Sequence, residues 1–361
     1  MSRTVITAEW LSPLGGSERV VEHLAAALPT ARVFTPCAFH GGAPSIDRDR
    51  ITAAFRRPER LMDRRQVAAA MNAATWPVWG RRLDRSADLV LASHHMSSHW
   101  TAVYSDVPHL AYVHTPARYA WFPELDDRAS GNPAARALGA HIRRMDRRAA
   151  TRVVSYAANS EATRQRIAQV WDRDARVIHP PTDLSRFEEA APTPGVEPYL
   201  LGLSRFIPYK RLDFVIDVAE AAGLPAVLVG SGHLEGMLRS RAAEASVPVR
   251  VVTDASDAQV VRLLADATAL VYPAVEDFGL VPVEAMAAGT PVLALDVAGT
   301  KETVRDGVSG YLLPDLDAAA WAERVGALDR LDRAAVRRRG QDFGVPAFHR
   351  QVEAWIAEEI G

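Results

Sequence analysis

Residues 272–289 read YPAVEDFGLVPVEAMAAG, and their pattern is the clearest indication of the fold class. The apolar residues before Pro273 predict a strand end, Gly279 lies in a loop, and a helix is expected to open near Pro282. Free N–H groups at residues 278–281 and the positive helix end can hold a phosphate, and Gly279 permits close approach of the ligand. The stretch therefore predicts a strand–loop–helix unit that binds an anion.

Two carboxylates lie eight positions apart in this stretch, Glu276 in the loop and Glu284 on the first turn of the helix. Such a pair can contact two parts of one ligand, with Glu284 accepting from a ribose diol and Glu276 reaching toward a sugar or diphosphate. The alternative is that Glu276 is a solvated loop acid and Glu284 only a favourable acid at a helix N-terminus.

A second strand–loop–helix unit lies upstream, at residues 201–211, LGLSRFIPYKR. Its loop places Arg205 and Lys210 five positions apart, which suits a cationic clamp for a phosphate leaving group. The chain has only two lysines, Lys210 and Lys301. Alone, Arg205 and Lys210 would be read as a surface charge pair; beside the carboxylates they favour one nucleotide-diphosphate site.

Short apolar runs alternate with amphipathic stretches along the whole chain, which is typical of an α/β protein with parallel sheets covered by helices. We expect strands at residues 4–8, 31–35, 89–92, 109–113, 153–157 and 175–179, then at 198–203, 226–229, 249–252, 269–272 and 291–294. Helices are expected at 211–222, 258–265 and 283–288, among others.

The aperiodic, proline-rich residues 179–198 predict a linker between two Rossmann-like domains. We expect an N-terminal domain over residues 1–180 and a C-terminal domain over 181–345. Residues 346–361 then form a helix with Phe348, Val352, Trp355 and Ile356 on one face, expected to pack back on the N-terminal domain.

Composition places the chain among ordinary globular proteins, with 361 residues, 48% hydrophobic and 24% charged. Disordered chains, fibres and disulfide miniproteins are excluded. Cys37 is the only cysteine, so we expect no disulfide and no cysteine-based metal site. The sequence contains no apolar run of about 18 residues, and its start is too short in apolar residues for a signal peptide. A cytoplasmic protein is expected.

Charge is divided unevenly, since residues 1–180 carry a formal +8 and residues 181–361 carry −10. The first half is expected to meet an anionic partner, either a membrane surface or a phosphorylated acceptor. The basic residues 56–65, continuing toward Trp76 and Trp79, predict a segment that touches anionic lipid at the inner face of the cytoplasmic membrane. The alternative is a solvated helix that packs on the core.

Together the motifs resemble the retaining glycosyltransferases of family four, which have the GT-B fold of two Rossmann-like domains facing across a cleft. The residues that carry the resemblance are EWLSPLGGSERVVEHLA at 9–25, SHH at 93–95, YVHTPARYAW at 112–121, ANS at 158–160, VIHPPTDLSRF at 177–187, SRFIPYKR at 204–211, EDFGLVPVE at 276–284 and AGTPVLALDVAGTKETVRDGVSGYLL at 288–313. The segment at 112–121 is similar to mannosyltransferases that use GDP-mannose in polysaccharide assembly.

The resemblance implies a donor-binding C-terminal domain, an acceptor-binding N-terminal domain, no cofactor and no metal. The implied donor is a nucleotide sugar, with GDP-mannose favoured and a UDP-sugar as the alternative; the acceptor is a glycan or a lipid-linked molecule. The resemblance implies catalytic roles for His114, Glu276, Arg205 and Lys210. Donor binding passes to Gly15, Gly16, Arg205, Lys210, Glu276, Phe278, Gly279, Leu280, Val281 and Glu284, and acceptor binding to Arg118, Tyr119 and His95.

Two positions depart from the family pattern: Ala8 replaces a usual histidine, and Thr253 replaces a usual glycine. Other functions fit less well. A Rossmann oxidoreductase needs a Gly-x-Gly-x-x-Gly turn, which SPLGGSE does not supply, and no nucleic-acid motif accompanies the basic residues. A non-catalytic nucleotide-sugar-binding protein stays open. Weak metal candidates are the Asp-x-Asp pairs at 47/49, 172/174 and 315/317 and the histidines His94, His95 and His99.

Overall fold

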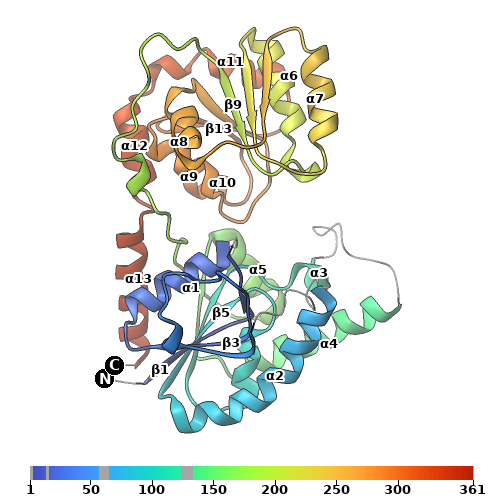
Figure 1. Cartoon of the computed structure of the whole chain (residues 1–361), viewed down its shortest axis with the longest axis vertical. Helices are drawn as coiled ribbons and strands as arrows, with labels where there is room; N and C mark the ends of the chain where they lie inside the picture. The colour runs from blue at the N-terminus through green and yellow to red at the C-terminus, as the bar shows by residue number, and fades with distance from the viewer. Residues whose placement is uncertain (1–2, 14–15, 57–64, 123–132, 361) are drawn as a thin grey trace. The chain divides into compact units, whose positions relative to one another are not determined.

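The computed structural model describes residues 3–13, 16–56, 65–122 and 133–360, with backbone only at 65–70, 84 and 133–135. The chain divides into two compact units. The first unit contains Met1–Pro181 and Phe348–Gly361, and the second contains Thr182–Ala347. Each unit holds one parallel β-sheet with helices on both faces (Figure 1), which confirms the expected α/β class.

The sheet of the first unit has the strand order β2-β3-β1-β5-β6-β7-β8, with β4 paired to β3. All its pairings are parallel. Its strands are β1 (Thr4–Ala8), β2 (Trp10–Leu11), β3 (Arg32–Ala38), β4 (Ile51–Arg56), β5 (Leu89–His94), β6 (His109–Val113), β7 (Ser155–Ala158) and β8 (Arg176–Val177).

Helices cover both faces of this sheet (Figure 1). On one face α1 (Gly16–Ala27) and α13 (Val345–Ile360) pack on apolar side chains such as Ile6 and Leu91. The other face packs on α2 (Arg65–Ser86), α3 (Arg118–Trp121), α4 (Pro133–Ala150) and α5 (Glu161–Trp171). Successive strand residues point to opposite faces, which is why uninterrupted apolar runs mark these strands.

The second unit repeats the design with the strand order β11-β10-β9-β12-β13-β14. Its strands are β9 (Leu200–Leu203), β10 (Ala226–Val229), β11 (Val249–Val252), β12 (Ala269–Tyr272), β13 (Val292–Leu295) and β14 (Gly310–Leu313). One face packs on α6 (Leu212–Ala222), α7 (Glu235–Glu244) and α11 (Ala318–Val325), and the other on α8 (Asp257–Asp266), α9 (Leu280–Ala287) and α12 (Arg333–Gln341). The short α10 (Thr300–Thr303) follows β13.

Three strands were missed by the sequence: β2, β4 and β14. In the first sheet, β2 and β4 each pair only with β3. In the second sheet, β14 is an edge strand that pairs with β13. Edge strands bury less surface, so their apolar signal is weaker. Helix α9 begins at Leu280, two residues before the expected Pro282. Pro282 is tolerated in the first turn because the N–H it lacks would have no partner in the helix.

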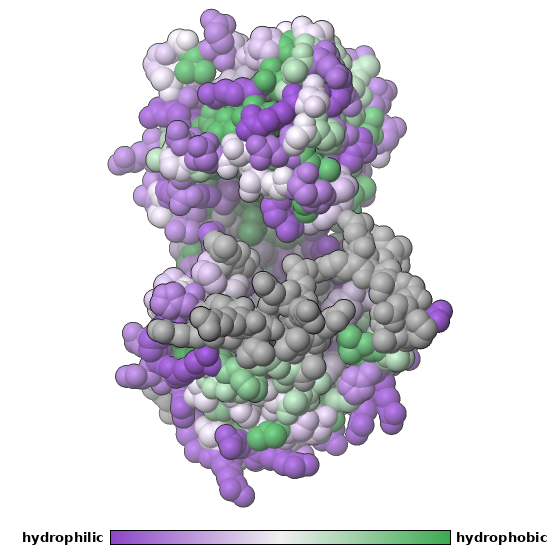
Figure 2. Space-filling model, turned by 45° about the vertical axis from the view of Figure 1, so that its right-hand side comes forward, coloured by the Kyte–Doolittle hydropathy of each residue, from purple (hydrophilic) through white to green (hydrophobic). Residues whose placement is uncertain are grey.

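The aromatic residues proposed to touch lipid lie in the core. Trp76 and Trp79 are buried, and the Trp76 indole N–H donates to Ser97 Oγ at 3.0 Å. Burial contradicts the prediction that these two residues contact a membrane; residues 57–64 lie outside the described part of the chain. None of the described helices combines the length and apolar character needed to span a membrane. Figure 2 shows hydrophilic residues spread over the described part of the face in view.

The terminal helix α13 belongs to the first unit from Phe348 onward. Its buried stripe of Phe348, Val352, Trp355 and Ile356 completes the apolar cluster of β1, β5 and α1. The indole N–H of Trp355 donates to Ser155 Oγ at 3.0 Å. This helix therefore closes one face of the first sheet.

Replacing Trp355 with alanine should lower the free energy of unfolding of the first unit by about 3–5 kcal/mol, because it opens a cavity in a fully buried cluster. Denaturant unfolding followed by tryptophan fluorescence and circular dichroism measures the loss. Ile360→Ala is the control, since Ile360 lies on the same helix and is exposed. Equal stability of the two variants would contradict the packing described here.

Candidate active site

In the second unit, the candidate site lies where the strand order reverses. The first strand, β9, lies between β10 and β12, so the chain moves to one side of β9 and then returns to the other. Loops that follow β9 and β12 therefore meet at the carboxyl ends of the strands, where open α/β sheets bind ligands. These loops are residues 204–211 and 273–279, the two segments singled out in the sequence.

Lys210 and Glu276 are brought together at this edge. The Lys210 ammonium forms an ion pair with Glu276 Oε1, and the Tyr272 hydroxyl donates to Glu276 Oε2. Lys210 is only 4% exposed. Burial, followed by the Glu276 carboxylate, raises the pKa of Tyr272 well above its ordinary value, so this hydroxyl remains a donor. The arrangement places a buried cation beside the start of α9.

Arg205 lies in the same loop as Lys210 and contacts Tyr209, a residue to which the sequence motifs assign no role. Its Nη2 donates to Tyr209 Oη at 2.8 Å. The Lys210 Nζ lies 5.2 Å from the centroid of the Tyr209 ring and 5.8 Å from that of Tyr272. The two cations of loop 204–211 thus share contact with Tyr209.

Glu284 contacts an arginine that was also missed. Arg186 Nη2 donates to Glu284 Oε1 at 2.5 Å, and the Arg186 guanidinium lies 4.7 Å from the centroid of the Phe187 ring. Arg186 lies in the stretch 177–187, which carries part of the family resemblance and overlaps the predicted linker, but no role was assigned to Arg186. Its partner is 98 positions away, a separation that no local pattern reveals.

The loop before α9 depends on two glycines. Gly279 has φ +88° and caps α9, a conformation that glycine adopts without strain. A Cβ on Gly299 would lie 2.3 Å from Phe278 Cα, and the Gly299 N–H donates to the Glu276 carbonyl at 3.0 Å. The Phe278 ring is core, 5.5 Å from that of Phe343. Residues 278–281 can therefore offer a ligand backbone groups, while Leu280 and Val281 pack partly on the core.

In the first unit, a buried carboxylate organises the edge formed by β1, β5 and β6. Glu9 follows β1 and is 1% exposed. Its Oε1 accepts from the backbone N–H groups of residues 95–98 at 3.2, 3.0, 2.8 and 2.8 Å. Glu9 Oε2 lies 3.1 Å from His95 Nδ1. A single carboxylate thus fixes the loop that follows β5.

The pKa values of two histidines at this edge are shifted in opposite directions. Burial would lower the pKa of His95, but the Glu9 carboxylate and then Glu18 raise this pKa above its ordinary value. Burial and then the charge of His95 lower the pKa of His114 to about 3. The Nε2 of His114 lies 2.9 Å from Ser93 Oγ, and the His95 and His114 ring centroids are 6.2 Å apart. The pKa values of these two neighbouring imidazoles are therefore shifted in opposite directions.

The remaining candidates in the first unit surround this edge. Gly16 is the first residue of α1, and a Cβ there would meet nothing within 4 Å; Gly15 lies outside the described residues. Arg118 and Tyr119 are half-buried in α3, which follows the loop of His114. Tyr119 packs against the cluster that contains Trp76 and Trp79. Acceptor binding by these residues is a proposal.

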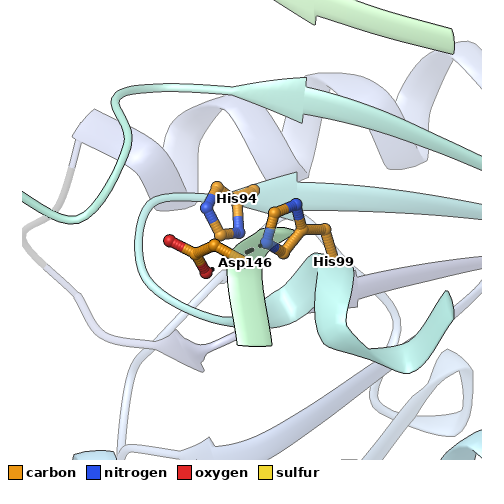
Figure 3. A group of neighbouring side chains, drawn as sticks. All are labelled: His94, His99 and Asp146. Atoms are coloured by element: carbon orange, nitrogen blue, oxygen red, sulfur yellow. Dashed lines mark hydrogen bonds and ion pairs between the residues drawn. The ribbon is translucent and has the colours of Figure 1, made fainter. Parts of the chain in front are cut away.

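His94 and His99 lie in the core with Asp146 (Figure 3). Ligand atoms of the three residues lie within 4.8 Å of one another, a spacing compatible with a metal ion. Asp146, however, already accepts from the indole N–H groups of Trp100 at 2.6 Å and Trp121 at 2.7 Å and lies 3.2 Å from His99 Nε2. Ring centroids of His94 and His99 are 3.9 Å apart. We interpret Asp146 and His99 as part of a buried hydrogen-bond network on which the His94 ring packs.

The Asp-x-Asp pairs include residues with structural roles. Asp317 caps α11 by accepting from the Ala319 N–H at 3.0 Å. Asp172 ends α5 in the left-handed conformation, with φ 53°. Asp174 pairs with Arg164 at 2.9 Å. Helix termination and surface pairing account for these acids.

Comparison with protein families covers most of the chain. Residues 14–186 match the family model "Glycosyltransferase Family 4", and residues 185–339 match "Glycosyl transferases group 1". The two matches overlap at residues 185–186, close to the boundary between the structural units at Pro181 and Thr182.

Curated relatives are similar over part of their length. A D-inositol 3-phosphate glycosyltransferase of Nocardia farcinica is 32% identical over 211 residues, covering 50% of this chain and 47% of the relative. A phosphatidyl-myo-inositol mannosyltransferase of Mycobacterium leprae is 32% identical over 185 residues, covering 49% of each. This chain therefore spans about half the length of these relatives.

Solved structures match over almost the whole chain. HepE of Anabaena in complex with UDP-glucose has a TM-score of 0.72 at 18% identity, covering 99% of this chain and 100% of that one. The lipopolysaccharide outer core galactosyltransferase WaaB has a TM-score of 0.73 at 15% identity, with the same coverage.

Two parallel α/β units, each with its candidate residues at the carboxyl ends of its strands, define a protein of the GT-B class. The chain belongs to glycosyltransferase family 4, a family of retaining enzymes.

Glu9→Gln should lower the pKa of His95, because the amide keeps an acceptor for the four N–H groups but removes the charge. Nitrogen-15 NMR of the histidine rings between pH 3 and 9 measures the change. We expect His95 in the wild type to titrate above its ordinary 6.5 and His114 to remain neutral down to about pH 3. An unchanged His95 titration in the variant would contradict the pairing.

The same pair should shape stability against pH. Because the folded pKa of His95 is raised, its contribution is complete below 6.5 and is lost as the pH rises through the folded value. Burial would raise the pKa of Glu9, yet His95 and the backbone donors hold it well below 4.5, so the contribution of Glu9 is present above 4.5 and is lost as the pH falls. The difference in the free energy of unfolding between the wild type and Glu9→Gln should therefore be greatest between pH 4.5 and 6.5.

Proposed function

We propose that the protein transfers a hexose, with retention of configuration, from a nucleotide sugar to a glycan, glycolipid or glycosylated acceptor. The observation that carries this proposal is the buried Lys210 beside Glu276 at the strand-order reversal of the second sheet. In this proposal the second unit binds the donor, and the first unit, with α13, binds the acceptor.

Negative charge builds on the diphosphate when the bond between the anomeric carbon and the phosphate oxygen breaks. The groups proposed to stabilise that charge are Arg205, Lys210 and the N–H groups at the start of α9. In this proposal they provide the stabilisation without a metal ion. The acceptor oxygen bonds to the same face of the anomeric carbon, and its proton passes to the leaving phosphate. We propose that the imidazole of His114, whose pKa is lowered to about 3 by burial, is neutral and forms a hydrogen bond with the sugar.

The contacts of the two glutamates fit different tasks. Glu276 is bound by Lys210 and Tyr272, which places this carboxylate close to the cation that would hold the phosphate. Glu284 is oriented by Arg186, which suits a carboxylate that accepts from the hydroxyls of a ribose. Donor binding would then divide the charge of Lys210 between Glu276 and phosphate.

GDP-mannose is the donor we propose. In support, the 112–121 segment is similar to mannosyltransferases, and one curated relative is named a mannosyltransferase. The HepE complex contains UDP-glucose, which makes a UDP-sugar the second candidate. The formal +8 of residues 1–180 supports an acceptor that carries phosphate and contact with an anionic membrane surface. The enzyme is proposed to be cytoplasmic.

Thermal unfolding of the full chain with GDP, GDP-mannose, UDP, UDP-glucose and UDP-N-acetylglucosamine tests the proposal. A ligand at 100 times its dissociation constant should add about 2.7 kcal/mol of stability. Stabilisation by GDP compounds alone supports the mannose donor, and stabilisation by UDP compounds alone replaces it. No stabilisation by any nucleotide would overturn the function. NMR detection of donor hydrolysis separates an enzyme from a binding protein.

Lys210→Ala should reduce kcat/KM for donor turnover by about 10²–10³-fold, comparable to loss of one donor that stabilises an oxyanion. Lys301→Ala is the matched control, since Lys301 is the other lysine, is 54% exposed at its side chain and pairs with Asp296 at 3.6 Å. Control activity should stay within about twofold of the wild type. A similar loss in both variants, or none in Lys210→Ala, would refute the role given to Lys210.

A further inference from the structure

Two cations in loop 204–211 contact the same aromatic side chain. We infer that Tyr209 is the positioning residue of this loop: its hydroxyl holds Arg205 and its ring holds Lys210, so that both cations are placed before a nucleoside diphosphate binds. The inference rests on the proposed function and adds a residue to which the sequence motifs assign no role.

The hydroxyl of Tyr209 restrains Arg205. Arg205 is exposed, and its Nη2 donates to Tyr209 Oη at 2.8 Å. A long exposed side chain loses rotamer freedom when a ligand immobilises it, and this loss weakens binding. Because Tyr209 already holds the guanidinium in one place, less freedom remains to be lost when phosphate binds.

The ring of Tyr209 lies against the neighbouring residue in the sequence, an arrangement that depends on the local backbone. Residues Pro208–Lys210 form a 3-10 turn, which Arg211 ends in the left-handed conformation with φ 49°. The turn allows Lys210 Nζ to lie 5.2 Å from the ring centroid of the residue before it. A cation at this distance from an aromatic face is attracted by it.

The exposure of Tyr209 fits a role at a ligand-binding edge. Its side chain belongs to the exposed large residues of the chain, at 41%, whereas Tyr272 on the other side of Lys210 is buried. Tyr209 can therefore be replaced without opening the core, and its variants report on the two cations.

Three variants separate the hydroxyl from the ring: Tyr209→Phe, Tyr209→Leu and the control Tyr311→Phe. Tyr311, on β14, is a matched control because it makes the same two kinds of contact. Its hydroxyl donates to the Ala327 carbonyl at 3.3 Å, and its ring centroid lies 5.2 Å from the Arg324 guanidinium. Calorimetric titration of the full chain with GDP and UDP should show about fivefold weaker binding for Tyr209→Phe and about twentyfold for Tyr209→Leu. Tyr311→Phe should bind as the wild type does, and all melting temperatures should agree.

A double-mutant cycle shows whether the hydroxyl acts through Arg205. We expect Arg205→Ala with Tyr209→Phe to bind no more weakly than Arg205→Ala alone, since the hydroxyl then has no guanidinium to hold. Losses of nucleotide affinity that multiply in the double variant would overturn this inference alone. So would Tyr209 variants whose affinity lies within twofold of that of a wild type that binds nucleotide. A wild type that binds neither nucleotide would overturn the proposed function and the inference with it.

Discussion

The ion pair between Lys210 and Glu276 joins two loops that follow adjacent strands of the second sheet. It forms because β9 and β12 run parallel and side by side, with Leu200 opposite Ala269, so that their carboxyl ends bring residues 66 positions apart into contact. A buried lysine needs a charged partner, and Glu276 supplies it. The same pairing holds a cation where the α9 helix presents its positive end, and the geometry of the candidate donor site follows from it.

The sequence predicted most of the central strands and the two loops of the second unit, because uninterrupted apolar runs and a strand–loop–helix order are local signals. It did not reveal Glu9, Arg186 or Tyr209. Glu9 acts on residues more than 80 positions away, and Arg186 meets Glu284 across the second unit. Such contacts depend on the folded arrangement of strands and cannot be read from spacing. The prediction that Trp76 and Trp79 contact lipid was wrong for a different reason. An amphipathic pattern near basic residues is typical of a helix packed on the core as well as of a lipid-binding helix.

The first unit uses buried polar groups in two ways. Glu9 satisfies four backbone N–H groups and pairs with a histidine at the edge of the sheet, whereas Asp146 accepts from two indoles inside the core. Removing either carboxylate would leave several buried donors unpaired, which costs more than an ordinary hydrogen bond contributes. Both networks therefore restrict the first unit to one arrangement of the loop that joins β5 to β6.

The chain leaves the first unit at Pro181 and returns to it at Phe348. The second unit is thus an insertion within the first, and the part of α13 that completes the first unit is synthesised after the whole of the second unit. The second unit is continuous in sequence and can complete its core while translation proceeds. The apolar face of β1, β5 and α1 stays uncovered until α13 has been synthesised, so the first unit cannot complete its core before the second unit has been made.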